Sequence, residues 1–240
     1  MKKKAISVPV LMYHKVGESS ANKVLNVSES DFRKQVRFLH GLGYEAVTFA
    51  ETVAGVYKDA ILPKKPLCLT FDDGYQGLLN HAKPILDEFG WKATLFIPTK
   101  WMGTLNYWCQ HHDKPLSPLI GLDDIRELHK QGWEIAGHTH SHVHLDRIGI
   151  EEAEEEIALG TSGITEIIGQ APLTFCYPYG GFNEDTIALV KKYGYIGACT
   201  TKSGLAKKTV DPYLIPRVKI ATRDGIAGLI YRLWIRPFLG

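Results

Sequence analysis

The stretch "LTFDDGYQG" (residues 69–77) is an apolar run that ends in two adjacent carboxylates and then turns at a glycine. The run is apolar throughout rather than alternating, which is typical of a strand covered on both faces in a parallel sheet. Taken alone, Asp72 and Asp73 are typical of a helix start, where carboxylates accept hydrogen bonds from free backbone N–H groups. The surrounding sequence indicates a further role for them.

The order of elements along the chain predicts a β/α barrel. Eight apolar runs predict strands, and most are followed by a stretch of helical periodicity; the runs are 8–14, 45–49, 66–71, 92–98, 133–138, 173–178, 195–201 and 213–220. Repeated strand–helix units with apolar strands favour a closed or nearly closed barrel, and a doubly wound open sheet is the alternative. No glycine-rich phosphate motif follows any run, which lowers the nucleotide-binding alternative. Length and the absence of a linker predict a single domain over residues 1–240.

Composition excludes little, but it bears on partners and location. Lys and Arg total 28 against 26 Asp and Glu, so no electrostatic argument favours a nucleic-acid partner. The basic start of the chain resembles a signal peptide, but Pro9 and His14 interrupt its apolar run. No run approaches the roughly 20 apolar residues of a membrane span, so we expect a cytoplasmic protein. The segment 225–240 either packs on the barrel or rests at the inner membrane face, because it mixes Trp and Arg with aliphatic residues.

Polar residues gather where predicted strands end, which is where barrel enzymes carry their chemistry. The third run ends in Asp72 and Asp73, and the first ends at His14. A later run is followed by four alternating histidines, namely His138, His140, His142 and His144. Two imidazoles four residues apart and one carboxylate are suitable ligands for a catalytic divalent metal. The first and third of these histidines fit that spacing, and so do the second and fourth.

Three motifs carry a resemblance to a known family. "LTFDDG", "GWEIAGHTHSH" and "FCYPYG", in this order, resemble the first three motifs of the polysaccharide deacetylases, the carbohydrate esterase family 4 or NodB-homology domain. The resemblance implies a distorted barrel of seven to eight strands. It also implies a hydrolase that removes N-acetyl groups from an N-acetylated sugar of a polysaccharide, oligosaccharide or glycolipid. It implies a metal bound by Asp73, His138 and His142, which we expect to be Zn²⁺, with Co²⁺, Ni²⁺ or Fe²⁺ as alternatives.

The same resemblance distributes the catalytic roles. Asp72 would be the general base, since beside a cation one carboxylate binds the ion and the other accepts the proton of the attacking water. The family places an oxyanion-binding backbone N–H at the tyrosine of its third motif, here Tyr179. His140 and His144 are then expected beside the site without binding the metal.

The chain departs from the common pattern in two places. Cys176 and Tyr177 occupy the stretch where the third motif carries an arginine that orients the base, and no histidine follows His144 to serve as the late general acid. "VPVLMYHKV" (8–16) resembles the opening of the subgroup that deacetylates poly-N-acetylglucosamine biofilm polymers, in which the acid histidine comes first. His14 is therefore the candidate acid, because the first and last strands of a closed barrel are neighbours. Arg217, in the last predicted strand, is the candidate for the orienting arginine.

Several alternatives stay open at this point. The same site would also suit an O-acetyl esterase or an amidase acting on a non-sugar amide, and the two departures favour a non-catalytic carbohydrate-binding relative. Trp101, Tyr107 and Trp108 either stack on sugar rings or form a hydrophobic cluster under a loop. The acidic stretch "EEAEEEIALG" (151–160) predicts the solvated face of a helix.

Overall fold

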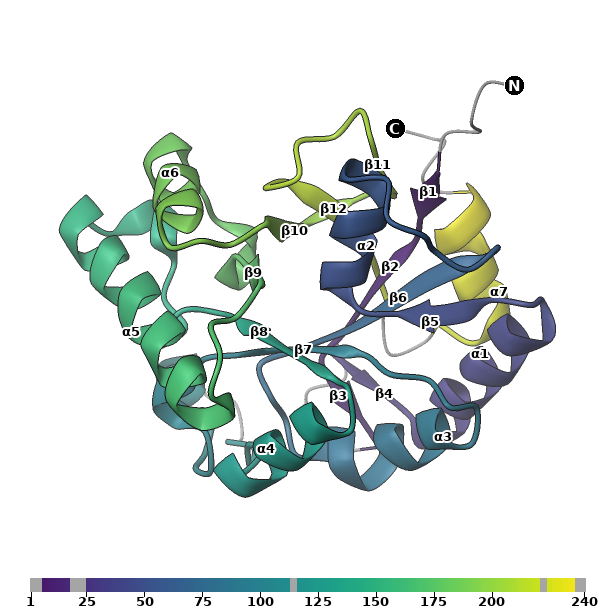
Figure 1. Ribbon diagram of the computed structural model, residues 1–240. Helices are drawn as coiled ribbons and strands as arrows, with labels where there is room; N and C mark the ends of the chain where they lie inside the picture. Colours follow the sequence, from purple (N-terminus) through teal and green to yellow (C-terminus); the bar gives the residue numbers. More distant parts are fainter. Residues whose placement is uncertain (1–5, 18–24, 113–115, 221–223, 236–240) are drawn as a thin grey trace.

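The computed structural model describes residues 6–17, 25–112, 116–220 and 224–235 (Figure 1). Its centre is a closed barrel of seven parallel strands: β2 (Val10–Tyr13), β6 (Pro66–Asp72), β7 (Thr94–Ile97), β8 (Glu134–Gly137), β9 (Thr174–Cys176), β10 (Gly197–Ser203) and β12 (Ile215–Lys219). The barrel closes because β2 pairs with β12 on one edge and with β6 on the other. The predicted barrel is confirmed, and the open sheet is excluded.

The eighth predicted strand exists but does not belong to the barrel wall. β5 (Glu45–Val47) pairs only with residues 66–68, the first half of β6, whose later residues 70–72 pair with β7. β5 and β7 therefore pair with different parts of β6, β5 with its start and β7 with its end. The count of eight barrel strands was one too many.

The barrel is irregular at its joints, as the predicted distortion requires. β8 and β9 are joined at a single residue pair, Gly137 with Phe175, and the register between β10 and β12 shifts between Cys199 and Ser203. Two small ladders lie outside the barrel. They are formed by β1 (Ser7–Val8) with β11 (Ala206–Lys207), and by β3 (Lys15–Val16) with β4 (Asn26–Val27).

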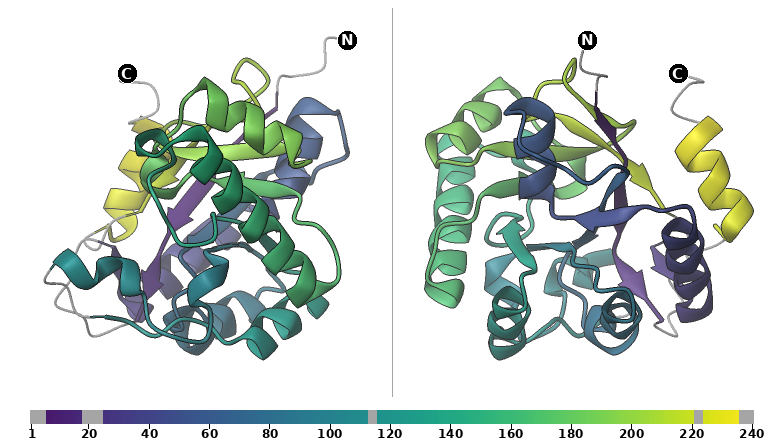
Figure 2. Two further views of the ribbon diagram at one scale, coloured as in Figure 1. Left: turned by 90° about the vertical axis from the view of Figure 1, so that its left-hand side faces the viewer. Right: turned by 45° about the vertical axis from the view of Figure 1, so that its right-hand side comes forward.

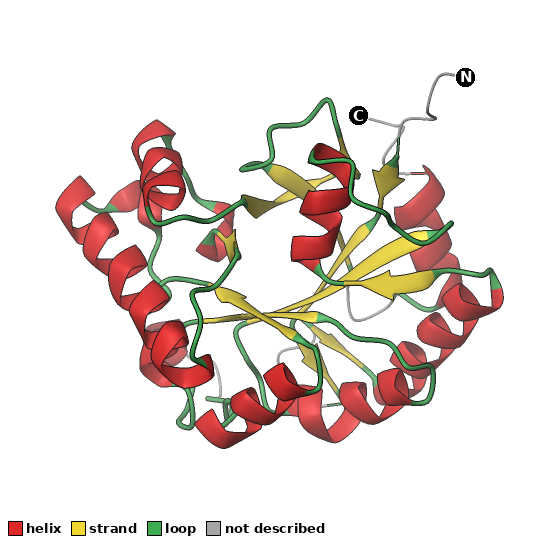
Figure 3. Cartoon of the chain, viewed as in Figure 1, coloured by secondary structure: helices red, strands yellow, loops and turns green. Residues whose placement is uncertain are grey.

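Helices surround the barrel (Figures 2 and 3). They are α1 (Glu29–Gly41), α2 (Phe49–Tyr57), α3 (Lys83–Asp87), α4 (Leu122–Lys130), α5 (Ile150–Ile168), α6 (Glu184–Lys192) and α7 (Ile226–Ile230). Sequence signals fix several ends: Ser28 accepts from the Asp31 N–H to cap α1, and Gly169 ends α5 with φ 79°. Short turns of π- or 3₁₀-helix span Leu78–Ala82, Thr99–Trp101, Tyr107–His112, Leu145–Arg147, Pro178–Gly180 and Tyr231–Ile235.

The interior of the barrel is filled by apolar packing. Each barrel strand contributes one buried residue to a single cluster: Val10, Cys68, Phe96, Ala136, Cys176, Cys199 and Ile215. Phe49, Val53 and Val56 of α2 join this cluster. The N–H groups of Phe49 and Ala50 donate to Thr94 and Glu134, the first residues of β7 and β8, so α2 covers the amino end of the barrel. The opposite end, where the strands finish, is the one that can receive a ligand.

The last described segment packs on the barrel. Leu229 and Leu233 are buried, and the Trp234 ring lies edge-on to Phe38 of α1 with centroids 6.4 Å apart. Packing is thus what the described part of the 225–240 segment shows, whereas Arg236 and its neighbours lie outside the described residues. No helix among the described residues is long and apolar enough to cross a membrane. Cytoplasmic location, membrane contact and the single-domain boundary stay predictions.

Candidate active site

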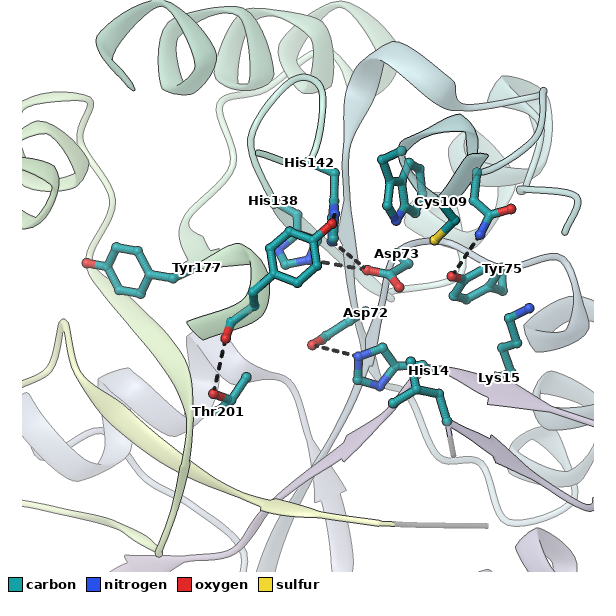
Figure 4. Close-up of a pocket in the computed structure, with 14 residues that line it drawn as sticks. His14, Lys15, Asp72, Asp73, Tyr75, Cys109, His138, His142, Tyr177 and Thr201 are labelled. Atoms are coloured by element: carbon teal, nitrogen blue, oxygen red, sulfur yellow. Dashed lines mark hydrogen bonds and ion pairs between the residues drawn. The ribbon is translucent and has the colours of Figure 1, made fainter. Parts of the chain in front are cut away.

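The carboxyl ends of the strands surround one pocket (Figure 4). Side chains from β6, from the segment after β8, from the turn after β9 and from the end of β2 face it. The lining residues are His14, Lys15, Leu25, Asp72, Asp73, Tyr75, Asn106, Trp108, Cys109, His138, His142, Tyr177, Tyr179 and Thr201. The pocket therefore brings together nearly all of the predicted site residues.

Asp73, His138 and His142 form a compact group on one wall. Asp73 Oδ1 lies 3.3 Å from His138 Nε2 and 3.1 Å from His142 Nε2, and all three side chains are buried. Their candidate ligand atoms lie within 4.8 Å of one another. Burial raises the pKa of Asp73, but the two imidazoles outweigh it and hold that pKa well below its usual value. The carboxylate is therefore ionised at neutral pH.

The second nitrogen of each imidazole is held by a partner. His138 Nδ1 lies 2.7 Å from the Cys176 carbonyl oxygen, which can only accept, so Nδ1 carries the proton. His142 Nδ1 lies 3.1 Å from Tyr179 Oη. In both rings Nε2 faces Asp73, the orientation that metal-binding histidines adopt. One carboxylate oxygen and two Nε2 atoms fit a divalent cation such as zinc.

The other two alternating histidines lie outside this group. His140 Nδ1 is 2.9 Å from Thr99 Oγ1, and the His144 ring stacks on the Tyr179 ring with centroids 3.8 Å apart. The structure thereby distinguishes the two pairs that the spacing left equivalent. His144 therefore contacts Tyr179, a residue that lines the pocket, whereas His140 bonds to Thr99 in the turn after β7.

Asp72 is held by Arg217 from the last barrel strand. Arg217 donates from Nη1 to Oδ1 and from Nη2 to Oδ2, both at 2.7 Å, and its side chain is fully buried. The remaining N–H groups donate to the Thr200 carbonyl, Thr70 Oγ1 and Cys176 Sγ. Burial raises the pKa of Asp72, but the guanidinium outweighs it, so the net pKa is lowered. Both oxygens of Asp72 are thus bonded to an arginine from another strand than the one that ends in the third motif.

His14 completes this side of the pocket. It follows β2, whose Leu11 pairs with Val218 of β12, and its Nε2 lies 3.8 Å from Asp72 Oδ2. Its side chain is 16% exposed, lines the pocket and lies beside the Asp72 carboxylate (Figure 4).

Tyr179 adopts a backbone conformation that favours glycine, with φ 59°. Among the described residues, its backbone N–H finds no acceptor. Gly180 follows with φ 79°, and a Cβ there would lie 2.1 Å from Thr201 Oγ1. The turn therefore brings its backbone close to Thr201, while the Tyr179 side chain reaches His142.

Several lining residues were not predicted from the sequence. Lys15 Nζ lies 4.3 Å above the Tyr75 ring, and Tyr75 Oη accepts from Asn106 Nδ2 at 3.3 Å. Burial, together with Asp73, raises the pKa of Tyr75, so the phenol stays protonated. Lys15 directly follows His14 and Tyr75 lies two positions after Asp73, so closeness in sequence to predicted site residues was the available signal.

Of the three aromatic residues singled out in the sequence, one lines the pocket. The Trp108 ring stacks on His142 with centroids 4.6 Å apart and planes 27° from parallel. Trp101 and Tyr107 contact each other instead, with centroids 5.6 Å apart.

A family model described as polysaccharide deacetylase matches residues 59–198. The chain belongs to the polysaccharide deacetylase family. This confirms the predicted family and identifies the chain as a carbohydrate deacetylase.

Individual relatives agree with this assignment. "Putative polysaccharide deacetylase YxkH" of Bacillus subtilis (strain 168) is 29% identical and covers 97% of this chain and 77% of its own length. The poly-beta-1,6-N-acetyl-D-glucosamine N-deacetylase of Staphylococcus aureus (strain MRSA252) is 27% identical over 97% of this chain and 84% of its own. The structure of the deacetylase PplD of Streptococcus pyogenes has a TM-score of 0.83 at 23% identity and covers 95% of this chain and 99% of that one, which confirms the fold. The Staphylococcus relative agrees with the subgroup that "VPVLMYHKV" predicts.

Proposed function

We propose that this chain is a metal-dependent N-deacetylase that removes acetyl groups from N-acetylglucosamine units of a polysaccharide. The observation that carries the proposal is that two adjacent carboxylates have different partners. Asp73 faces two imidazole Nε2 atoms, whereas Asp72 is held by a buried arginine with one of its oxygens 3.8 Å from His14. The similarity to the Staphylococcus deacetylase supports the choice of substrate class.

The proposed metal ligands are Asp73, His138 and His142. The donor set suits Zn²⁺, and Co²⁺, Ni²⁺ or Fe²⁺ are alternatives with similar ligand preferences. A bound cation supplies Lewis acidity, which polarises the amide carbonyl and makes water more acidic.

The remaining roles belong to side chains and backbone of this chain. Asp72 accepts a proton from the attacking water, and Arg217 fixes the orientation of its carboxylate. The backbone N–H of Tyr179 donates to the oxyanion that forms as water adds to the amide carbon. His14 donates a proton to the nitrogen of the leaving amine, which otherwise departs poorly.

The alternatives differ in substrate or in turnover. An O-acetyl esterase or a non-sugar amidase would use the same groups, so only substrates distinguish them. A non-catalytic binding relative was favoured by the missing arginine of the third motif and the missing late histidine. Against that alternative, an arginine and a histidine from other strands, Arg217 and His14, both lie beside Asp72.

The test is acetate release from oligomers of β-1,6-linked N-acetylglucosamine by metal-stripped protein, with zinc or cobalt added back. We expect release only with metal, and Asp72→Asn should keep the metal but lose 10²–10⁴-fold in kcat. An O-acetylated sugar and a simple N-acetyl amide serve as comparison substrates. Release from either of these, without release from the oligomer, would contradict the proposed substrate class, and normal turnover by the Asp72 variant would remove it as the base.

A further inference from the structure

The segment between the two proposed metal-binding histidines has an unusual backbone. Thr139 and His142 both lie in the left-handed region, with φ 63° and φ 67°. This region favours glycine, and a β-branched threonine there is uncommon. Such a conformation persists only where its surroundings hold it, so the contacts of the segment His138–His142 (the histidine loop) matter.

The carbonyl side of the histidine loop is held by the turn after β7. The Thr139 and His140 carbonyls accept from the backbone N–H groups of residues 99 and 100 at 3.4 and 2.9 Å. The Ser141 carbonyl accepts from the Trp101 indole N–H at 3.1 Å. Within the loop, Thr139 Oγ1 accepts from the His142 N–H at 3.0 Å.

The N–H side of the loop is held by one carboxylate, that of Glu156 on α5. Its Oε2 accepts from the His140 N–H at 3.0 Å and from the Ser141 N–H at 2.8 Å, and its Oε1 accepts from Ser141 Oγ at 2.5 Å. Hydrogen bonds to a charged acceptor are stronger than neutral ones. Glu156 belongs to the acidic stretch that predicted a solvated helix face, and for this residue that prediction was wrong.

The same helix approaches the loop closely one turn later. A Cβ at Gly160 would lie 2.8 Å from the Thr139 carbonyl carbon and 2.9 Å from its oxygen. The absence of a side chain at this position therefore lets α5 come near enough for the Glu156 carboxylate to reach two consecutive backbone N–H groups.

We propose that Glu156 is a positioning residue that holds the histidine loop so that His138 and His142 direct Nε2 toward Asp73. Its carboxylate bonds to two backbone N–H groups and the Ser141 hydroxyl, and it does not line the pocket, so it acts through the loop. The hydrogen bonds between Glu156 and the histidine loop do not require a metal. The expected effect of Glu156 on metal affinity rests on the proposed function.

Three variants test this. Glu156→Ala removes all three hydrogen bonds. Glu156→Gln keeps an amide oxygen for the two backbone N–H groups and an amide N–H for the Ser141 hydroxyl. Glu155→Ala is the matched control, because Glu155 is the exposed neighbour on the same helix. Hydrogen exchange of the His140 and Ser141 amides is measured in metal-free protein, relative to amides of β7, and zinc affinity is measured by competition with a chelator.

We expect Glu156→Ala to speed exchange of both loop amides at least tenfold relative to β7, and to weaken zinc binding by about 10–100-fold. Glu156→Gln should recover most of both losses, and Glu155→Ala should match the unchanged protein. Wild-type exchange at both amides in Glu156→Ala would overturn the proposal. Faster exchange with unchanged zinc affinity would overturn the link to the metal site. If the unchanged protein itself binds no zinc, the proposed function fails, and the exchange comparison still decides whether Glu156 holds the loop.

Discussion

Replacing Arg217 with methionine would leave a carboxylate buried without its cation. Asp72 is 3% exposed, and both of its oxygens accept from Arg217 at 2.7 Å. Breaking a buried pair by removing one partner costs about 3–5 kcal/mol, because the remaining charge is uncompensated. The bonds from Arg217 to Thr200 and Thr70 are lost as well. We therefore expect the free energy of unfolding of Arg217→Met to fall by about 3–5 kcal/mol at neutral pH.

The assay is urea unfolding of metal-free protein, since a bound ion would add its own contribution to stability. The double variant Asp72→Asn/Arg217→Met removes the buried charge together with its partner. Its loss should be smaller than the sum of the two single losses by about 1–3 kcal/mol. A single Arg217 variant within about 0.5 kcal/mol of the unchanged protein, or additive single losses, would refute the reasoning.

The same variant has a consequence for pH dependence. Burial raises the pKa of Asp72, and Arg217 opposes it. Without the guanidinium, burial acts with less opposition, so the pKa of Asp72 rises. The acid limb of the kcat/KM profile should move to higher pH while zinc content stays unchanged.

Three further predictions follow from other contacts. His138→Ala should lose zinc, measured as metal content after dialysis, and full occupancy would contradict its role as a ligand. His14→Gln should keep zinc but lose 10²–10⁴-fold in kcat, and a fully active variant would remove His14 as the acid. Burial of its carboxyl raises the pKa of Glu134, a half-buried residue bonded to Thr94 and Thr174. A raised folded-state pKa contributes stability below the unfolded pKa of about 4.3 that is lost as pH rises through the folded value. Between pH 4 and pH 7, the free energy of unfolding of Glu134→Gln should therefore rise relative to that of the unchanged protein. A difference that stays constant with pH would contradict this.

The fold was largely predictable because a parallel barrel repeats one pattern. Apolar runs marked every barrel strand, and cap signals such as Ser28 marked helix ends. The pattern could not reveal that β5 pairs only with residues 66–68, because an apolar run looks the same whether it joins the barrel wall or extends one edge of a neighbour.

The site was predictable where its members lie within motifs and less so where they do not. Asp73, His138 and His142 came from short contiguous motifs. Arg217 was only a candidate, because Asp72 is 145 positions away and nothing local marks an arginine as its partner. Glu156 was missed because helical periodicity places it among exposed glutamates, and only the approach of α5 to the histidine loop gives its carboxylate a partner.

The closure of the barrel between β2 and β12 has a consequence for how the protein is made. β2 is the first barrel strand to be synthesised and β12 the last, and Leu11 and Val218 meet only after both exist. A nascent chain that ends before β12 leaves the edges of β2 and β10 unpaired, and exposed strand edges promote aggregation. Such a chain also lacks Arg217, so Asp72 cannot be buried without cost. Premature termination should therefore yield an insoluble or degraded chain rather than a weak deacetylase, and translation past residue 219 is the step that makes the enzyme.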